Sequence, residues 1–252
     1  MKTKLTLTIT AALAAACIAT PANAAAATCF GKKATIVGTN GADMINGTKK
    51  PDVIFARGGG DTIQGADGSD RICAGDGNDR VGARNGFDRI DGGDGDDEIH
   101  GGGKGSGVDP GDGDTMIGGG GDDWLDGRRG ELDDKSFGGP GDDLLQGNER
   151  AEGGSGNDTI DLDGYVNDAG PDYANGGPGD DTIRGDQGLS ENELHGGPGR
   201  DQIYGTGADD RLFGDEDDDL LDGAFGDDVL DGGDGNDTCR ASAASRKDAC
   251  EL

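Results

Sequence analysis

Single apolar positions recur every nine residues along most of the chain, each within a run of Gly, Asp and Asn. The repeating unit is Gly-Gly-x-Gly-x-Asp-x-apolar-x, and residues 92–100 show it in full. Its last three residues place one apolar side chain between two others, which predicts a short strand with one inward side chain. Its first six residues predict a turn, because Gly tolerates positive φ and the close approach of another backbone.

The same frame fits most of the chain between residues 38 and 240. One such unit is a weak signal in a Gly-rich chain, but many copies in register predict an array of stacked repeats. Further full copies are residues 118–126, 138–146, 153–161, 176–184, 196–204 and 232–240, and looser copies fill 38–100 and 205–231.

This unit resembles the calcium-binding nonapeptide of the repeats-in-toxin (RTX) family. The resemblance implies an all-β fold, a parallel β-roll (a right-handed β-helix or solenoid), and calcium as the ligand. Two units then make one coil, so each inward side chain stacks on its equivalent two units later. We expect the core to include the column Ile45, Ile63, Val81, Ile99, Leu125, Leu145, Ile160, Ile183, Ile203 and Leu221.

Irregular turns all fall on alternate units. Counting each segment from residue 38 to residue 240 as a half-coil predicts about 21 half-coils. Because successive half-coils lie on opposite sides, we call their turns the odd edge and the even edge, and we expect a regular odd edge and a decorated even edge. The irregular even-edge segments are 101–117, 127–137, 147–152, 162–175 and 185–195, and their sixth positions include Asp134, Glu149, Asp172 and Asn192.

The sixth position of the unit supplies the candidate metal ligands. Calcium takes about six to eight oxygen ligands from carboxylates, backbone carbonyls and water. In the resembled family each ion lies between neighbouring turns of one edge, so we expect several calcium ions along the odd edge. The predicted ligands are Asp43, Asp61, Asp79, Asp97, Asp123, Asp143, Asp158, Asp181, Asp201, Asp219 and Asp237, and weaker even-edge candidates are Asp52, Asp70, Asp88, Asp210 and Asp228.

The composition has few hydrophobic residues and a large negative charge, and both oppose folding. Only 31% of the residues are hydrophobic and the formal net charge is -30, a balance that is typical of disordered chains. The periodicity leaves two states open, a chain unfolded by itself or one folded with something that cancels its charge. We therefore predict a chain that folds as calcium binds, with an affinity of about 10⁻⁴–10⁻³ M. The same charge disfavours nucleic acid as a partner.

Residues 1–24 read as a signal peptide, with Lys2 and Lys4 before an apolar stretch and a small-residue cleavage site at 22–24. The apolar stretch is too short to span a membrane, and no other stretch is longer. An alternative makes Cys17 a lipidated cysteine. We expect a secreted protein, with attachment to the cell envelope as the alternative. We also expect an N-terminal cap at 25–37, the roll at 38–240 and a C-terminal cap or tail at 241–252.

Four cysteines remain after cleavage: Cys29, Cys73, Cys239 and Cys250. An even number in an exported protein favours disulfides, and three pairings are possible. We favour Cys29–Cys73 and Cys239–Cys250, which would fasten the two ends of the array. Free buried thiols are the alternative.

No residue set predicts an enzyme. Acidic pairs such as Asp96 and Asp97 recur at nearly every turn, which favours metal ligands or solvated carboxylates over a catalytic dyad. His100 and His195 occupy outward ninth positions of the repeat. The leading function is a calcium-binding structural protein. Alternatives are a calcium-dependent adhesin or polysaccharide-binding module that uses the long even-edge turns, and an accessory domain of an enzyme.

Overall fold

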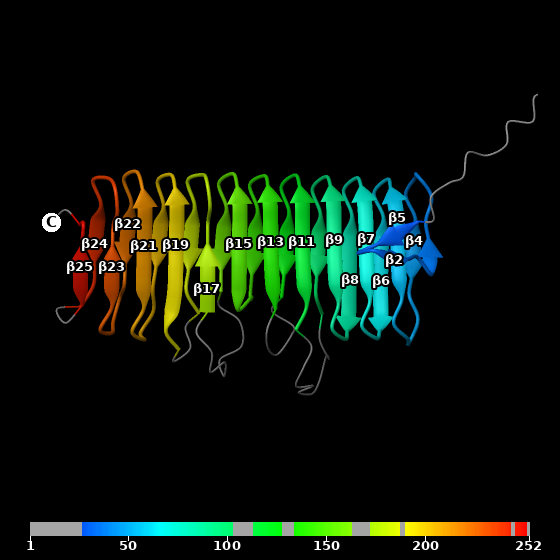
Figure 1. Ribbon diagram of the computed structural model, residues 1–252, viewed down its shortest axis with the longest axis horizontal. Helices are drawn as coiled ribbons and strands as arrows, with labels where there is room; N and C mark the ends of the chain where they lie inside the picture. The colour runs from blue at the N-terminus through cyan, green and yellow to red at the C-terminus, as the bar shows by residue number, and fades with distance from the viewer. Residues whose placement is uncertain are drawn as a thin grey trace, which may run out of the picture.

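The computed structural model describes residues 27–102, 113–127, 134–162, 172–186, 190–242 and 245–250. These residues form an elongated solenoid in which successive strands alternate between two parallel sheets, as Figure 1 shows. No helix occurs among them. The predicted all-β class and parallel β-roll are confirmed, whereas the count of 21 half-coils stays a prediction because several even-edge segments lie partly outside the described residues.

The two sheets contain 11 and 12 strands. The 11-stranded sheet contains β4 (Met44–Asn46), β6 (Thr62–Asp67), β8 (Arg80–Asn85), β10 (Glu98–His100), β12 (Trp124–Asp126), β14 (Leu144–Gln146), β16 (Thr159–Asp161), β18 (Thr182–Arg184), β20 (Gln202–Tyr204), β22 (Leu220–Asp222) and β24 (Thr238–Arg240). The 12-stranded sheet contains β3 (Ile36–Val37), β5 (Val53–Gly58), β7 (Arg71–Asp76), β9 (Arg89–Asp94), β11 (Thr115–Gly120), β13 (Lys135–Pro140), β15 (Arg150–Ser155), β17 (Asp172–Asn175), β19 (Asn192–Pro198), β21 (Arg211–Glu216), β23 (Val229–Asp231) and β25 (Arg246–Asp248).

The core lies between the sheets and consists mainly of the eighth residues of the units. Apolar first-position residues add to it, namely Ala56, Ala74, Ala83 and Leu162. Ile63 pairs with Ile45 and Val81, and the same register continues to Leu221 and Cys239. The predicted inward column is buried throughout, with Ile45 7% exposed at the N-terminal end. The facing column of the 12-stranded sheet is thinner in its middle, where it holds Ser136, Ala151 and Ala174.

Many strands are longer than the predicted three residues. In the 12-stranded sheet, β9 and β11 keep pairing beyond the inward position, where Gly119 faces Gly93 and Gly120 faces Asp94. Turns of equal length can stack their backbones, so pairing runs into the odd-edge turns. From β10 to β18, the strands of the 11-stranded sheet stop at three residues, and the even-edge segments that follow them differ in length.

The N-terminal end is fastened by a disulfide. An antiparallel hairpin of β1 (Thr28–Cys29) and β2 (Lys32–Lys33) is joined to β7 by Cys29–Cys73. The guanidinium of Arg89 lies 4.1 Å from the ring centroid of Phe30, which stands between the two hairpin strands. The hairpin is thereby held against the 12-stranded sheet.

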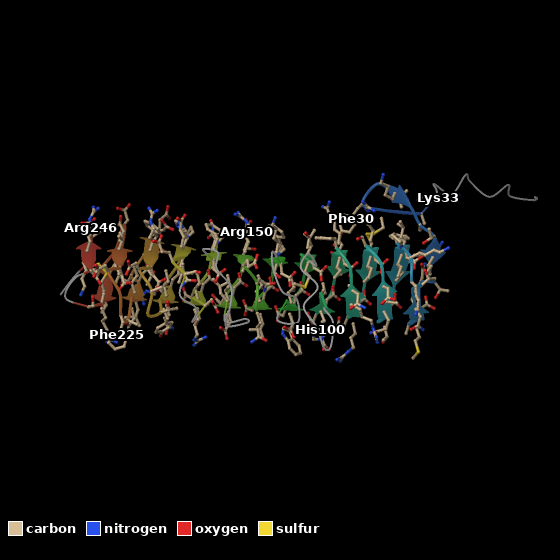
Figure 2. The ribbon with its side chains drawn as sticks, turned by 90° about the horizontal axis from the view of Figure 1, so that it is seen from below. Phe30, Lys33, His100, Arg150, Phe225 and Arg246 are labelled. Atoms are coloured by element: carbon tan, nitrogen blue, oxygen red, sulfur yellow. A yellow bond between two sulfur atoms is a disulfide. The ribbon has the colours of Figure 1, made fainter. Side chains whose placement is uncertain are left out.

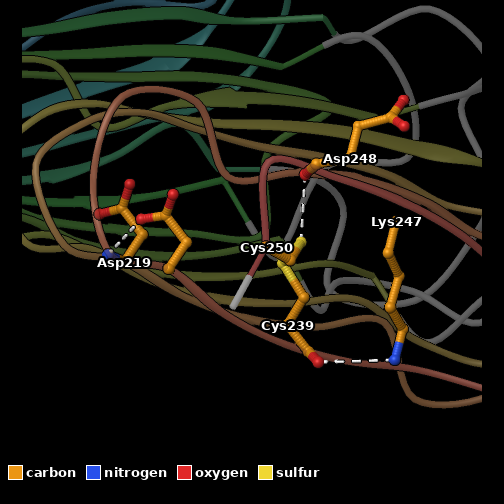
Figure 3. Close-up of a disulfide and its surroundings, with 6 residues drawn as sticks. Asp219, Cys239, Lys247, Asp248 and Cys250 are labelled. Atoms are coloured by element: carbon orange, nitrogen blue, oxygen red, sulfur yellow. Dashed lines mark hydrogen bonds between the residues drawn. A yellow bond between two sulfur atoms is a disulfide. The ribbon is translucent and has the colours of Figure 1, made fainter. Parts of the chain in front are cut away.

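The C-terminal end is closed by Cys239–Cys250 and by a change of residue type in the core column (Figure 3). Lys247 of β25 pairs with Leu230, but it is exposed and its Nζ donates to the carbonyl oxygen of Cys239 at 3.5 Å. A cation at this position ends the apolar stack. Both favoured disulfides are therefore present.

Outward residues of the strands cover the two outer faces. Figure 2 shows Arg150 and Arg246 on one outer face and His100 on the opposite one. His100 contacts Glu98, Asp126 and Trp124 there, which agrees with its predicted outward position. Within the described ranges, no helix has the length and apolar character needed to cross a membrane.

Candidate metal-binding edge

The sixth-position Asp residues of the odd edge form one continuous ladder. The backbone N–H of Asp97 donates to Oδ1 of Asp123 at 2.8 Å, and the N–H of Asp123 donates to Oδ1 of Asp143 at the same distance. The same bond links every successive pair from Asp43 to Asp237, with N···O distances of 2.6–2.9 Å. The structure thus brings all eleven predicted residues into one column. The turns that follow β5, β7, β9 and the later strands of the same sheet line the top edge of Figure 1.

The second carboxylate oxygen of this ladder has a different environment. From Asp61 to Asp237, Oδ2 of each sixth-position Asp is buried and accepts no hydrogen bond from any described residue. The residues themselves are almost inaccessible; Asp123, for example, is 3% exposed. Buried carboxylate oxygens normally have donors or a cation, because leaving them unpaired is costly. Ten aligned oxygens without a donor in the described structure have the chemistry required of cation ligands.

Glycine at the first position leaves a small space beside this buried oxygen. A Cβ added to Gly92 would overlap Oδ2 of Asp97, and one added to Gly118 would overlap Oδ2 of Asp123. Each would also press on the carbonyl oxygen of the next coil, that of Gly118 or Gly138. The first-position Gly therefore preserves a small cradle lined by a carboxylate and a backbone carbonyl, both of which are calcium ligands.

The turn conformation is kept at several positions where Arg or Asp replaces the consensus Gly. Gly93 and Gly95 have φ of 113° and 128° at the second and fourth positions. Arg57 keeps a φ of 88° at the second position, and Asp215 and Asp217 keep 77° at the second and fourth. A side chain in this region costs about 1–2 kcal/mol, so the stack imposes the turn on these residues. The replacement of Gly by Asp217 leaves the turn in place.

Burial raises the pKa of the odd-edge sixth-position carboxyl groups from Asp61 to Asp219. The pKa of Asp123 rises to about 7, mainly through desolvation and further through Asp143 and other carboxylates, whereas the hydrogen bond from Asp97 lowers it. The pKa of Asp201 rises to about 8 for the same reasons. The charged form is thus disfavoured unless a cation compensates it.

Side chains alone do not complete a metal site. Within the described part of the chain, no three His, Cys, Asp or Glu side chains converge on one point. A bound cation would therefore take one or two carboxylates and complete its shell with turn carbonyls and water. Calcium accepts such a mixture, whereas zinc sites use side-chain nitrogen and sulfur.

The even edge repeats this ladder over two described stretches. It runs from Asp52 through Asp70, Asp88 and Asp114 to Asp134, and again from Asn192 through Asp210 to Asp228. Oδ2 of Asp70 has no donor among the described residues, so this weaker candidate has the odd-edge arrangement.

The sheet order shows on which edge the described ends of the irregular segments lie. The strands that follow them, β11, β13, β15, β17 and β19, all belong to the 12-stranded sheet. The described ends of these segments therefore share one edge, as predicted. Residues 103–112, 128–133, 163–171 and 187–189 lie outside the described residues, so their suggested recognition role stays a prediction.

Asp43 differs from the other predicted ligands. Its Oδ2 accepts hydrogen bonds from the backbone N–H of Thr39 at 2.6 Å and from the Thr39 hydroxyl at 3.0 Å. Sequence reasoning overlooked this arrangement, although its signal, Thr in place of Gly at the second position, is visible in the chain. Asp43 belongs to the ladder, but its carboxylate already has partners.

Comparison with known proteins agrees with this geometry. A family model described as RTX calcium-binding nonapeptide repeat (4 copies) matches most of the roll, and none of the curated proteins matches the chain. The matched residues are 37–72, 47–81, 74–103, 111–145, 145–164, 168–189, 190–221 and 204–239. Because these matches cover well over half of the chain, the protein belongs to the family of RTX calcium-binding nonapeptide repeats.

Proposed function

We propose that this protein is an exported calcium-binding repeat protein whose roll folds as calcium ions bind along the odd edge. The ligands are the sixth-position Asp residues from Asp61 to Asp237 together with carbonyls of the Gly-rich turns. Asp70 on the even edge is a further candidate ligand. The proposal assigns no catalytic role to the chain.

One observation carries the proposal: ten buried Oδ2 atoms, one per coil, have no hydrogen-bond donor among the described residues. A divalent cation satisfies the oxygen and cancels the charge, and membership of a calcium-binding repeat family favours calcium over other cations.

The charge balance explains why folding should depend on the ion. Neighbouring carboxylates about 5 Å apart repel by about 1 kcal/mol per pair in water and by more inside a protein. Over ten links this repulsion is comparable with the ~5–15 kcal/mol that stabilises a typical domain. Each coil buries two inward residues, which offsets only part of that repulsion and of the ordering entropy.

Folding should also be cooperative. Each odd-edge carboxylate is hydrogen-bonded to the coil before it, as Asp123 is to Asp97, so one coil helps to position the next cation-binding turn. Repeat arrays gain most of their stability from such neighbour contacts. Several ions should therefore bind together over a narrow range of calcium concentration.

The test is a calcium titration of the chain beginning at residue 25, followed by calorimetry and circular dichroism together. We expect heat of binding for several ions and a parallel rise of β-structure, both reversed by EDTA. Magnesium is the control, because it demands a small octahedral shell and keeps its water, and should not induce the fold at equal concentration. A complete β spectrum in EDTA with no heat on adding calcium would refute the proposal.

Export rests on the sequence of residues 1–24, which lie outside the described residues. The two disulfides support it, because such bonds persist in oxidising compartments. Calcium is also far more abundant outside cells than in the cytosol, so a weak site would be filled there. Mass spectrometry of the native protein should find its N-terminus at residue 25, and an intact residue 1 would contradict this part of the proposal.

A further inference from the structure

Two classes of turn in the described roll differ in what satisfies the sixth-position carboxylate. In the first class the second residue has positive φ, as at Gly93 and Gly119, and Oδ2 of the Asp has no donor among the described residues. In the second class the second residue is Thr, and its φ is not positive. Its hydroxyl and its backbone N–H both donate to that same Oδ2.

Three threonine turns share one hydrogen-bond network. Thr48 donates to Oδ2 of Asp52 through its N–H at 2.7 Å and its hydroxyl at 2.9 Å. Thr206 does the same to Asp210 at 2.6 and 3.0 Å. In each turn the N–H of the fourth residue donates back to the Thr hydroxyl, as Lys50 does at 3.2 Å. The Thr39 turn repeats all of these bonds.

The donors in these turns occupy the oxygen that the other class leaves without a partner. Oδ1 of Asp210 also accepts the N–H and the side-chain amide of Asn192, at 2.9 and 2.8 Å, so this carboxylate has four donors. A carboxylate has about four acceptor positions. A turn of this class therefore compensates its buried charge without a cation.

We call the turns with this Thr network locked turns, and they lie near the ends of the roll. Thr39 and Thr48 stand in the first two turns, on opposite edges, within the part that Cys29–Cys73 fastens. Near the other end, Ser245 donates to Oδ2 of Asp228 at 3.1 Å and accepts the Asp228 N–H at 3.2 Å, which replaces a further Asp of the ladder. On the opposite edge at this end, Oδ2 of Asp201, Asp219 and Asp237 has no donor in the described structure.

Among the described turns, only those of the N-terminal end have a Thr network on both edges. We propose that residues 27–56 form a cation-independent unit that stays ordered when calcium is removed. It then serves as the template on which the remaining coils add as calcium binds. This inference rests on the proposed function, since it divides that function between turns that need the ion and turns that do not.

A preformed N-terminal unit would make folding of the remaining coils easier to start. Forming the first coil of a solenoid is costly, because two turns must be ordered before any stacking contact is gained. A preformed end bearing β5 and the Ile36, Ile45 and Ile54 core removes that cost. Growth then proceeds from the N-terminal end toward the C-terminal end.

Hydrogen exchange on the full mature chain in EDTA tests the proposal. We expect amides of residues 33–49 to exchange at least about tenfold more slowly than those of residues 134–162, whose turns lack the Thr lock. In calcium both regions should be protected. Equal exchange of the two regions in EDTA, fast or slow, would overturn the inference.

Variants of Thr39 and Thr48 provide a second test by hydrogen exchange. The double variant Thr39→Val and Thr48→Val removes both hydroxyls and keeps a β-branched residue, so protection of residues 33–49 in EDTA should fall by about tenfold. Thr39→Ser with Thr48→Ser keeps the hydroxyls and should keep the protection. Unchanged exchange in the valine variant would also overturn the inference.

Calorimetry keeps the two proposals apart. If the mature chain binds no calcium, the proposed function fails, whatever the exchange pattern. If calcium binds with unchanged stoichiometry in the valine variant while residues 33–49 and 134–162 exchange alike in EDTA, only the template inference fails.

Discussion

The backbone N–H of Asp97 donates to Oδ1 of Asp123, 26 residues further along the chain, whereas Oδ2 of Asp123 has no hydrogen-bond donor in the described structure. One oxygen of the side chain therefore joins two coils and the other is left for a ligand. The same difference between Oδ1 and Oδ2 repeats along the odd edge from Asp61 to Asp237.

Replacing Asp123 by Asn should have opposite effects with and without calcium. The amide oxygen can still accept from Asp97, but the negative charge is lost. In calcium we expect a loss of about 1–3 kcal/mol in the free energy of unfolding and weaker binding. In EDTA the same change removes a buried repulsive charge and should stabilise the chain. Urea unfolding in both buffers measures this.

Asp122→Asn is the matched control for that variant. Asp122 is exposed at the fifth position, and its Oδ1 accepts from the N–H of Asp142 at 2.9 Å, a bond that Asn preserves. We expect a smaller change in either buffer. Equal effects at positions 122 and 123 would contradict the assignment of the ligand to the sixth position.

Acid should partly replace calcium. In the folded, cation-free roll burial raises the pKa of Asp123 to about 7, well above its ordinary value of 3.8. The folded state then holds protons more tightly than the unfolded chain, so this stability is complete below about pH 4 and is lost as pH rises through 7. Circular dichroism in EDTA should show more β-structure at pH 4 than at pH 8.

Calcium affinity should change with pH in the opposite direction. Protons and calcium compete for the same carboxylates, of which Asp79 has a pKa raised to about 6 and Asp201 to about 8 by burial. Calorimetric titrations between pH 5 and pH 8 should show binding that tightens with pH. An affinity independent of pH across this range would show that these carboxyl groups are not the ligands.

Two neighbouring glycines should respond very differently to substitution by Ala. Gly119 has a φ of 119°, and a Cβ there would overlap the carbonyl oxygen of Gly93. Gly120 has its nearest neighbour, Oδ1 of Asp94, at 3.8 Å. We expect Gly119→Ala to cost at least about 1–2 kcal/mol and Gly120→Ala to cost less than 1 kcal/mol. Thermal unfolding in calcium checks the pair, and equal losses would contradict the turn geometry.

Removing the N-terminal disulfide should loosen the start of the roll. Cys29 and Cys73 are separated by 44 residues, and closing a loop of that size typically contributes about 2–4 kcal/mol. In Cys29→Ser with Cys73→Ser we expect a lower unfolding midpoint in calcium and faster proteolysis near the β1–β2 hairpin. Cys239→Ser with Cys250→Ser is the control, and it should leave that hairpin protected.

Much of this fold was predictable because a nine-residue period constrains every coil alike. Ile63 and Leu125 could be assigned to the core, and Asp97 and Asp143 to one edge, by counting alone. The same counting placed the irregular segments on one side. The local rule sufficed there because each coil contacts mainly its neighbours.

Counting residues could not assign individual hydrogen bonds. Asp43 and Asp61 occupy the same repeat position, yet Oδ2 of Asp43 is bonded to Thr39 and that of Asp61 has no described donor. Nor could the sequence say that β9 and β11 continue pairing into the turn, since that depends on two turns having equal length and shape.

The sequence by itself thus determined the period, the identity of the inward and sixth-position residues and the alternation of edges, because these follow from spacing along the chain. Only the tertiary structure decided which carboxylate oxygens are already satisfied and which disulfide pairing is made. Those properties depend on where donors and sulfur atoms of different coils meet in space, and residues 18 or more apart are brought together only by the completed stack.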